Sequence, residues 1–199
     1  LSDEVYQELV KSLRATKNYD VRLQLLRTMA RHGAVARQAK LVKIAIGEGR
    51  PTFQELVARA LFFESDSFDS GNLDLVDDDK LASVGPEVCI WLCMLTALVA
   101  PEDRLMQATK TLATNPDRQV FVSLILLTIP KHRTEAQYET IANFLPKDVV
   151  AKLETMVETE CSEDLTFLDS LGEVKSVERI KWAFRIWYKK KAKLLKRKS

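Results

Sequence analysis

The chain has 199 residues, of which 46% are hydrophobic and 29% charged, a composition that excludes a disordered chain and is typical of a globular one. A chain of this length buries enough apolar surface to fold without structural metals or disulfides. Only six glycines and six prolines interrupt it, and its many Leu, Ala, Lys and Glu residues favour helices over the tight turns of a strand-rich domain.

The net charge of +2 is distributed unevenly along the sequence. Residues 1–174 contain 19 Lys and Arg against 27 Asp and Glu, a net charge of −8. Residues 175–199 contain 11 against 1, a net charge of +10. Terminal blocks of like charge commonly contact nucleic acid, anionic membranes or acidic protein surfaces. The C-terminal segment therefore differs in charge from the rest of the chain and is a candidate contact surface for an anionic partner.

Helix start signals recur from the N-terminus. Ser2, followed by two acidic residues, predicts a helix that runs to about Ala15. Asp20 opens a second predicted helix that stops at Gly33. One face of this second helix carries apolar residues at every fourth position, namely Val21, Leu25 and Met29.

Two more helices are predicted before residue 64. One follows Gly33 and ends at residues 47–49, and the next begins with a capping box made by Thr52 and Glu55 after Pro51. Residues 64–80 then contain seven carboxylates, three serines and a glycine, a composition that indicates a loop.

Two nearly uncharged apolar runs, Val88–Ala100 and Val120–Pro130, follow this loop. Both are shorter than the ~20 residues needed to span a bilayer, so we interpret them as central helices of a core. Further helix starts are indicated at residues 85–87, 101–103, 115–117 and 146, where Pro, Gly or Asn precedes acidic or apolar residues.

Two segments share an Asn-x-Asp opening followed by an apolar helical pattern: "NYDVRLQLLRTM" from Asn18 and "NPDRQVFVSLIL" from Asn115. The first resembles the second helix of a HEAT-type repeat over about a dozen residues, although no fixed period links the remaining helices. The predicted fold is an all-α, irregular bundle of about 10–12 short antiparallel helices, HEAT-like in part, with a long basic C-terminal helix. We divide it into residues 1–64, an acidic loop at 65–80, a second helical group at 81–174 and the basic helix at 175–199.

The sequence contains few residues or motifs that indicate a catalytic site. The chain has only two histidines, and His32 and His132 both lie beside cations at expected helix ends, where a positive charge is favourable. No Gly-rich phosphate loop, nucleophile elbow or kinase signature occurs. We predict no catalytic residue, no cofactor and no small-molecule substrate, and hence a protein that is not an enzyme.

The three cysteines indicate reduced, buried thiols. Cys89 and Cys93 share one helical face inside an apolar run, but a single Cys-x-x-x-Cys pair is a poor zinc signature. Together with Cys161 the chain has three cysteines, an odd number, which favours reduced thiols and an intracellular location. We expect the protein to be cytoplasmic or nuclear, and it could attach to the surface of a membrane. No signal peptide opens the chain, and Leu at position 1 fits a processed product or an excised fragment.

The acidic loop invites comparison with a calcium-binding loop. Counting from Asp66 places Gly71 at the sixth position, but the third is Phe68 and the twelfth is Asp77 in place of Glu, so the match fails at a ligand position. We expect no metal there. A solvated acidic loop is the main interpretation, and a phosphorylatable or partner-binding loop containing Ser65, Ser67 and Ser70 is the alternative.

The C-terminal segment is predicted to be an amphipathic helix from Val174, prepared by a capping box of Ser170 and Glu173. At about 100° per residue its apolar residues form one broad face that would dock on the rest of the chain. These residues are Val177, Ile180, Phe184, Trp187, Tyr188, Leu194 and Leu195, with Ala183 at the edge.

The opposite face of this helix carries the predicted partner-binding residues, an exposed Trp and Ile among cations. They are Arg179, Trp182, Arg185, Ile186, Lys189, Lys190, Lys193 and Arg197. Burying this second face as well would require a partner, so we predict that the segment is both docked and competent to bind. The alternative is a helix that is covered near Trp182 and projects its Lys-rich end into water.

Several anionic partners fit this face: a membrane surface, RNA or DNA, or an acidic protein surface. The run "KKKAKLLKRK" also suits a nuclear-import signal, and the whole helix resembles a calmodulin-target peptide. The acidic body of one copy and the basic tail of another would also allow a homo-oligomer. The leading hypothesis is a non-enzymatic helical scaffold or adaptor, and the alternative is a self-assembling structural protein of the viral matrix or nucleocapsid kind.

Overall fold

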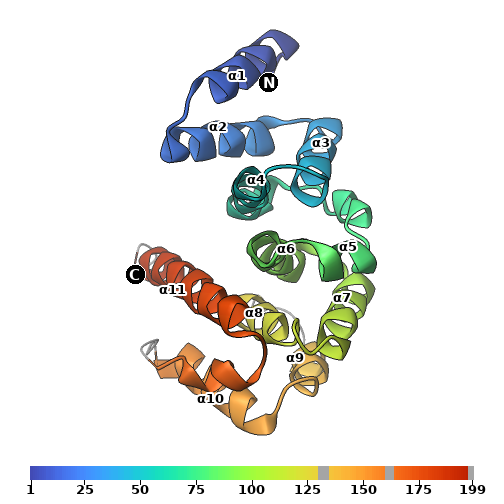
Figure 1. Ribbon diagram of the computed structural model, residues 1–199, viewed down its shortest axis with the longest axis vertical. Coiled ribbons are helices and arrows are strands. Elements are labelled where there is room, and N and C mark those ends of the chain that lie inside the picture. Colours follow the sequence, from blue (N-terminus) through green and yellow to red (C-terminus); the bar gives the residue numbers. More distant parts are fainter. Residues whose placement is uncertain (130–134, 160–163, 197–199) are drawn as a thin grey trace. The chain divides into compact units, whose positions relative to one another are not determined.

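The computed structural model describes residues 1–129, 135–159 and 164–196 (Figure 1). Within these ranges the chain forms α-helices and short 3-10 helices, and it forms no strand. The prediction of an all-α fold is confirmed. The chain divides into two compact units, unit 1 from Leu1 to Leu105 and unit 2 from Met106 to Ser199. The division predicted from the sequence, with an acidic loop at residues 65–80 between two helical groups, stays a prediction.

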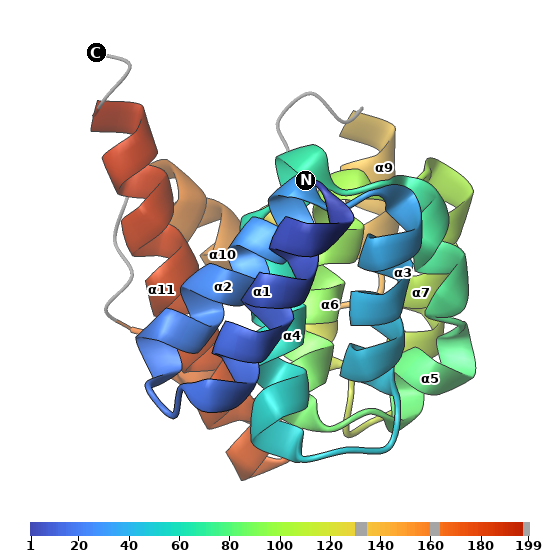
Figure 2. The same cartoon turned by 90° about the horizontal axis from the view of Figure 1, so that it is seen from above.

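Unit 1 is built around α4, which contacts α2, α3 and α6, while α1 packs on α2. In Figures 1 and 2, α2, α4 and α6 follow one another in one layer, and α3 and α5 lie to one side of it. The bounds are α1 Asp3–Ala15, α2 Tyr19–His32, α3 Val35–Ile46, α4 Pro51–Phe63, η1 Ser65–Ser67, η2 Ser70–Leu75, α5 Asp78–Ser83 and α6 Pro86–Val99. The helix α7 (Glu102–Thr114) spans the division between the units.

Local capping explains where the first helices begin. Ser2 Oγ accepts a hydrogen bond from the Val5 amide, as predicted. At α2, Asn18 Oδ1 accepts from the Val21 amide at 3.1 Å, so the helix starts at Tyr19 and the expected start at Asp20 is one residue late.

The predicted capping box of α4 is wrong, and the apolar face predicted for α2 is buried only in part. The helix α4 begins at Pro51 and its N-cap residue is Arg50, so Thr52 lies inside the helix and does not cap it. In α2, Val21 is 46% exposed, whereas the buried residues are Leu23, Leu26, Met29 and Ala30. A strict spacing of four drifts around the helix, because the α-helical repeat is 3.6 residues.

Gly33 ends α2 in an extended conformation, with φ −75° and ψ 138°, and not in the left-handed conformation common at helix ends. Any Cβ at this position would lie 2.4 Å from the Met29 carbonyl oxygen. A glycine is therefore required at position 33, because the Met29 carbonyl oxygen leaves no room for a side chain.

The acidic segment 64–80 is more ordered than the expected loop, because it contains η1, η2 and the start of α5. Gln38, which is 3% exposed, holds it in place. The Gln38 Nε2 group donates to the carbonyl oxygen of Ser67 at 2.7 Å, and Gln38 Oε1 accepts from the Asp69 amide at 2.9 Å. Asn72 is buried beside Gln38 and donates to the Val35 carbonyl oxygen.

The apolar run at Val88 forms the core of unit 1. Every residue from Val88 to Ala97 in α6 is buried, and Trp91 packs against Phe62 and Phe63 of α4. The prediction that this run is a central helix is confirmed. Within the described residues, no helix has both the length and the hydropathy needed to cross a bilayer.

Unit 2 is arranged around α8, which contacts α9, α10 and α11. All residues of α8 are buried, which confirms the expectation for the second apolar run as far as Thr128. The helix begins at Val120 and not at residues 115–117, because Asn115 Oδ1 instead accepts from the Asp117 amide and closes a turn. The bounds are α8 Val120–Thr128, α9 Glu135–Ala142, α10 Lys147–Thr159, η3 Thr166–Ser170 and α11 Val174–Lys196.

Candidate binding surface on the C-terminal helix

The helix α11 buries one face within unit 2, where it contacts α8 and η3. Val177 is 1% exposed, Ile180 and Ala183 are fully buried, and Phe184 is 3% exposed. Trp187 is half-buried. The predicted docking face is confirmed at these positions, and the side chains of Tyr188, Leu194 and Leu195 lie outside the described residues.

The start of α11 differs from the predicted capping box. Ser170 ends η3 and its hydroxyl donates to the Phe167 carbonyl oxygen, so it does not cap α11. The first residue of α11 is Val174, and its first main-chain hydrogen bond runs from the Val177 amide to the Glu173 carbonyl oxygen at 3.0 Å.

Apart from Ser176 and Lys181, which are buried, the remaining described residues of α11 form what we call the outer face. Its exposed members are Val174, Lys175, Glu178, Trp182 and Arg185, and its half-buried members are Arg179 and Ile186. Trp182 is 43% exposed, and the alternative of a helix covered near this residue stays a prediction. The side chains of Lys189, Lys190 and Lys193 and the whole of Arg197 lie outside the described residues.

Lys181 is a cation that the sequence reasoning did not single out. It is 7% exposed, and its Nζ donates to Asp169 Oδ1 at 2.5 Å and to Glu178 Oε1 at 2.9 Å. The hydrogen bond to Asp169 and then that to Glu178 raise the pKa of Lys181 above its ordinary value. Glu178 lies three residues before Lys181, a spacing that favours pairing on a helix, whereas nothing local in the sequence indicates Asp169.

Val174 is the first residue of α11, as the sequence predicted, but its place on the outer face, where it is 77% exposed, was not predicted. The 100° helical period places it within 80° of Trp182, on the same side of the helix. The outer face therefore carries more apolar surface than Trp182 and Ile186 alone.

Unit 1 contains a second cluster of charges. Glu64 is 4% exposed and accepts hydrogen bonds from the Nε groups of Arg27 and Arg31, each at 2.6 Å. His32 is exposed in the last turn of α2, next to this cluster, at the helix end that the sequence predicted. Since Glu64 caps the C-terminus of α4, the two arginines offset a carboxylate placed at the negative end of a helix.

The described cysteines are buried free thiols, as predicted. Cys89 and Cys93 are both fully buried in α6, with 3.7 Å between their sulfur atoms. Cys161 and His132 lie outside the described residues. Among the residues that the structure describes, no group of three or more His, Cys, Asp or Glu side chains is arranged to hold a metal ion.

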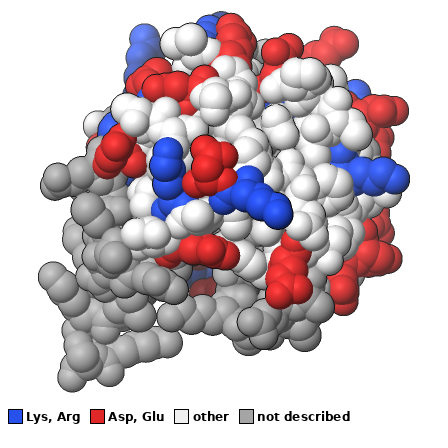
Figure 3. Space-filling view, turned by 90° about the horizontal axis from the view of Figure 1, so that it is seen from below, with Lys and Arg blue, Asp and Glu red and all other residues white. Residues whose placement is uncertain are grey.

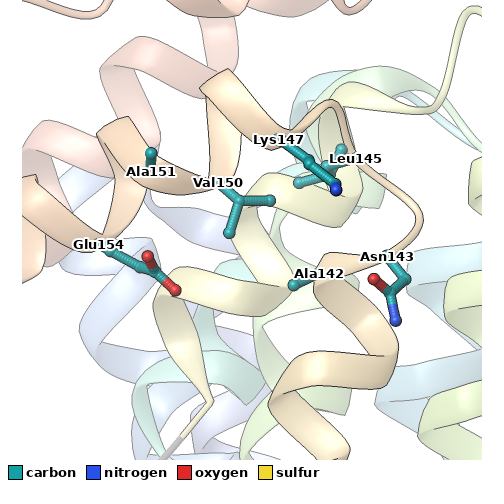
Figure 4. A pocket seen from close by; sticks show the side chains of 7 residues that line it. All are labelled: Ala142, Asn143, Leu145, Lys147, Val150, Ala151 and Glu154. Atoms are coloured by element: carbon teal, nitrogen blue, oxygen red, sulfur yellow. The ribbon is translucent and has the colours of Figure 1, made fainter.

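A shallow pocket of about 230 Å³ lies where α9 ends and α10 begins. In Figure 4, Lys147 and Glu154 lie at opposite ends of it, with Val150 between them. Its lining residues are Ala142, Asn143, Leu145, Lys147, Val150, Ala151 and Glu154. The lining contains no Ser, Cys or His, so it does not pair a nucleophile with a base in the manner of an acyl-transfer site.

The comparisons with known proteins give no family. No family model matches the chain, and no curated protein or solved structure is significantly similar to it. The distribution of charge and of exposed apolar surface is therefore the property of the chain that bears on its function. Figure 3 shows one face of the molecule, on which the described acidic and basic side chains are interspersed with uncharged surface. That face does not present a patch of a single sign among its described residues.

Proposed function

We propose that this chain is a non-enzymatic adaptor that binds an anionic partner through the outer face of α11. The observation that carries this proposal is the two-sided character of α11, which packs Ile180 and Phe184 into unit 2 and leaves Trp182 and Arg185 exposed. A helix that only completed a core would carry charged and polar residues on its solvent side.

The charge of the segment supports the same proposal. Residues 175–199 have a net charge of +10, and Lys175 and Arg185 are exposed cations of this segment. We propose that α11 is a continuous basic helix and that Lys189, Lys190, Lys193 and Arg197 extend the outer face. Each cation near an anionic surface contributes about 1 kcal/mol to binding.

We also propose that unit 1 is HEAT-like in part. The contacts of α2 with α4 and of α4 with α6 link alternate helices, as in stacked helical repeats. Such stacks commonly act as scaffolds, which agrees with the adaptor role.

The test uses substitutions and not a deletion, because removing residues 175–199 would also remove Val177, Ile180 and Phe184 from the core of unit 2. We would measure binding of the full chain to poly(U), polyglutamate and vesicles that contain phosphatidylserine. The double variant Lys175→Gln/Arg185→Gln should weaken binding to the preferred polyanion by roughly fivefold for each cation lost.

The matched control is Lys40→Gln/Lys43→Gln, which removes the same charge from exposed positions of α3. It should bind within about twofold of the unsubstituted chain, since the nonspecific effect of total charge is small at physiological salt. Failure of the unsubstituted chain to bind any of the three polyanions, or equal losses in both variants, would show that the proposal is wrong.

A further inference from the structure

The apolar part of the outer face carries an additional inference about the partner. In unit 2 the large hydrophobic side chains that are most exposed among the described residues are Val174, at 77%, and Trp182, at 43%. Both belong to α11, and Ile186, which is half-buried, follows Trp182 one turn later on the same side. Three apolar groups thus line about three turns of one exposed helical surface.

The described cations of the outer face flank this apolar line. Lys175 and Arg185 are exposed and Arg179 is half-buried. The single carboxylate on this face, Glu178, accepts a hydrogen bond from Lys181, and this pairing offsets its negative charge. The surface therefore offers apolar groups and positive charge along the same length of helix.

Resting on the proposed function, we infer that the partner is the surface of an anionic lipid bilayer, with α11 lying in the plane of the headgroups. In this arrangement Val174, Trp182 and Ile186 enter the boundary between headgroups and acyl chains, and the cations pair with lipid phosphates. Trp is well suited to this boundary, because its ring is apolar and its N–H is polar.

Nucleic acid explains the same surface less completely. Phosphates would pair with the cations and a base could stack on Trp182, but neither contact uses the aliphatic surface of Val174 and Ile186. A bilayer rewards burial of all three apolar groups together with the cations.

The experiment compares binding of the full chain to phosphatidylcholine vesicles, to the same vesicles with phosphatidylserine, and to poly(U). We expect tight binding only to the vesicles with phosphatidylserine. The variant Val174→Ser/Trp182→Ser should weaken that binding by about tenfold or more, since it removes apolar surface that only the bilayer buries. Binding to poly(U), where it is measurable, should change by less than about threefold, because phosphate contacts dominate it.

The matched control is Val21→Ser/Val35→Ser, which removes exposed apolar surface from unit 1, where the two residues are 46% and 52% exposed. This variant should bind vesicles as the unsubstituted chain does. Circular dichroism of both variants checks that the helices are retained.

A second measurement uses the unsubstituted chain and so does not depend on the folding of a variant. Lipids brominated near the top of the acyl chain quench indole fluorescence only where the ring enters the bilayer. Trp91 is fully buried, so quenching on binding reports on Trp182 and Trp187 of α11. We expect quenching with anionic brominated vesicles and none with neutral ones.

The possible outcomes separate the inference from the proposed function. Binding to poly(U) or polyglutamate that depends on Lys175 and Arg185, without binding to anionic vesicles, overturns the membrane inference and leaves the adaptor proposal standing. Vesicle binding that is unchanged in Val174→Ser/Trp182→Ser and gives no quenching also overturns the inference. Absence of binding to all three polyanions overturns both.

Discussion

Among the residues that the structure describes, each unit contains a buried charged side chain that lies between two partners of opposite sign. The two clusters differ in whether the buried charge could reach water if its partners were removed. In unit 1 the buried charge is the carboxylate of Glu64, 4% exposed, and its partners are Arg27 and Arg31. In unit 2 it is the ammonium of Lys181, 7% exposed, held by Asp169 and Glu178. A lysine has a long flexible stem that lets its charge reach water, whereas a glutamate at the end of a packed helix has a much shorter reach.

The partners differ as well. Arg27 and Arg31 lie 37 and 33 residues before Glu64, so their contacts join α2 to α4 across unit 1. Glu178 lies on the same helix as Lys181, and Asp169 is only 12 residues away. The first cluster is a tertiary cross-link between helices, and the second fixes the orientation of one helix on the short η3 segment before it.

The largest effect is expected from removing both arginine charges. Arg27→Met/Arg31→Met should lower the free energy of unfolding of unit 1 by about 3–5 kcal/mol, because it leaves a buried carboxylate without a partner. Methionine retains most of the apolar packing of the arginine stems. Urea unfolding followed by circular dichroism measures the loss. Arg14→Met, at an exposed position of α1, is the control and should change stability by less than about 0.5 kcal/mol.

A smaller loss is expected from the equivalent change in unit 2. Asp169→Asn/Glu178→Gln should destabilise by about 1–2 kcal/mol, because Lys181 can extend towards solvent once its partners are neutral. The same urea experiment applies, with Glu173→Gln as the control at an exposed position. A loss as large as that of the double arginine variant would mean that the lysine stem is held in place and that the comparison between the clusters fails.

Replacing the buried lysine itself should have less effect still. Lys181→Met leaves the Asp169 and Glu178 side chains, which are 57% and 62% exposed, in contact with water, so we expect a change within about 1 kcal/mol near neutral pH. Because the pKa of Lys181 is raised in the folded chain, its stabilising contribution is complete below the unfolded value of about 10.4 and is lost as pH rises through the folded value. In urea unfolding at alkaline pH, the free energy of unfolding of the variant should therefore rise relative to that of the unsubstituted chain. A difference between the two free energies that stays constant up to pH 12 would contradict this.

The smallest effect concerns Asp164, an exposed residue before η3. The Thr166 hydroxyl, and after it the Thr166 amide, donate hydrogen bonds that lower the pKa of Asp164. Its contribution to stability is therefore present above the unfolded pKa of about 3.9 and is lost as pH falls through the folded value. Asp164→Asn should remove part of the acid sensitivity of unit 2. Thermal unfolding in a pH series, with Asp148→Asn as the exposed control, tests this.

Much of the fold could be predicted from sequence because its determinants are local. Capping residues such as Ser2 and the apolar runs at Val88 and Val120 mark helices by short-range hydrogen bonding and composition. The errors arose where two local signals competed. Thr52 does not cap α4 because the helix already begins at Pro51, and Ser170 does not cap α11 because it belongs to η3.

The outer face of α11 could be predicted in part. The helical period places Phe184 and Trp182 on different faces of α11. Their exposed fractions differ accordingly, 3% for Phe184 and 43% for Trp182. The period could not show that Lys181 is buried, because its second acidic partner, Asp169, comes close only after η3 folds against α11. Val174 was predicted as the start of the helix but not as part of this face, because the first residue of a helix has no helical neighbour before it.

The sequence by itself determined that this chain is helical, where most of its helices begin, and that its positive charge is concentrated at one end. Those properties depend on hydrogen bonds and side-chain spacing within a few residues. The tertiary structure decided which charges leave the surface. Glu64 is buried because two arginines from α2 compensate the cost of removing its charge from water, and Lys181 because Asp169 of η3 does so together with Glu178 of its own helix. The contacts between different segments exist only after the chain has folded.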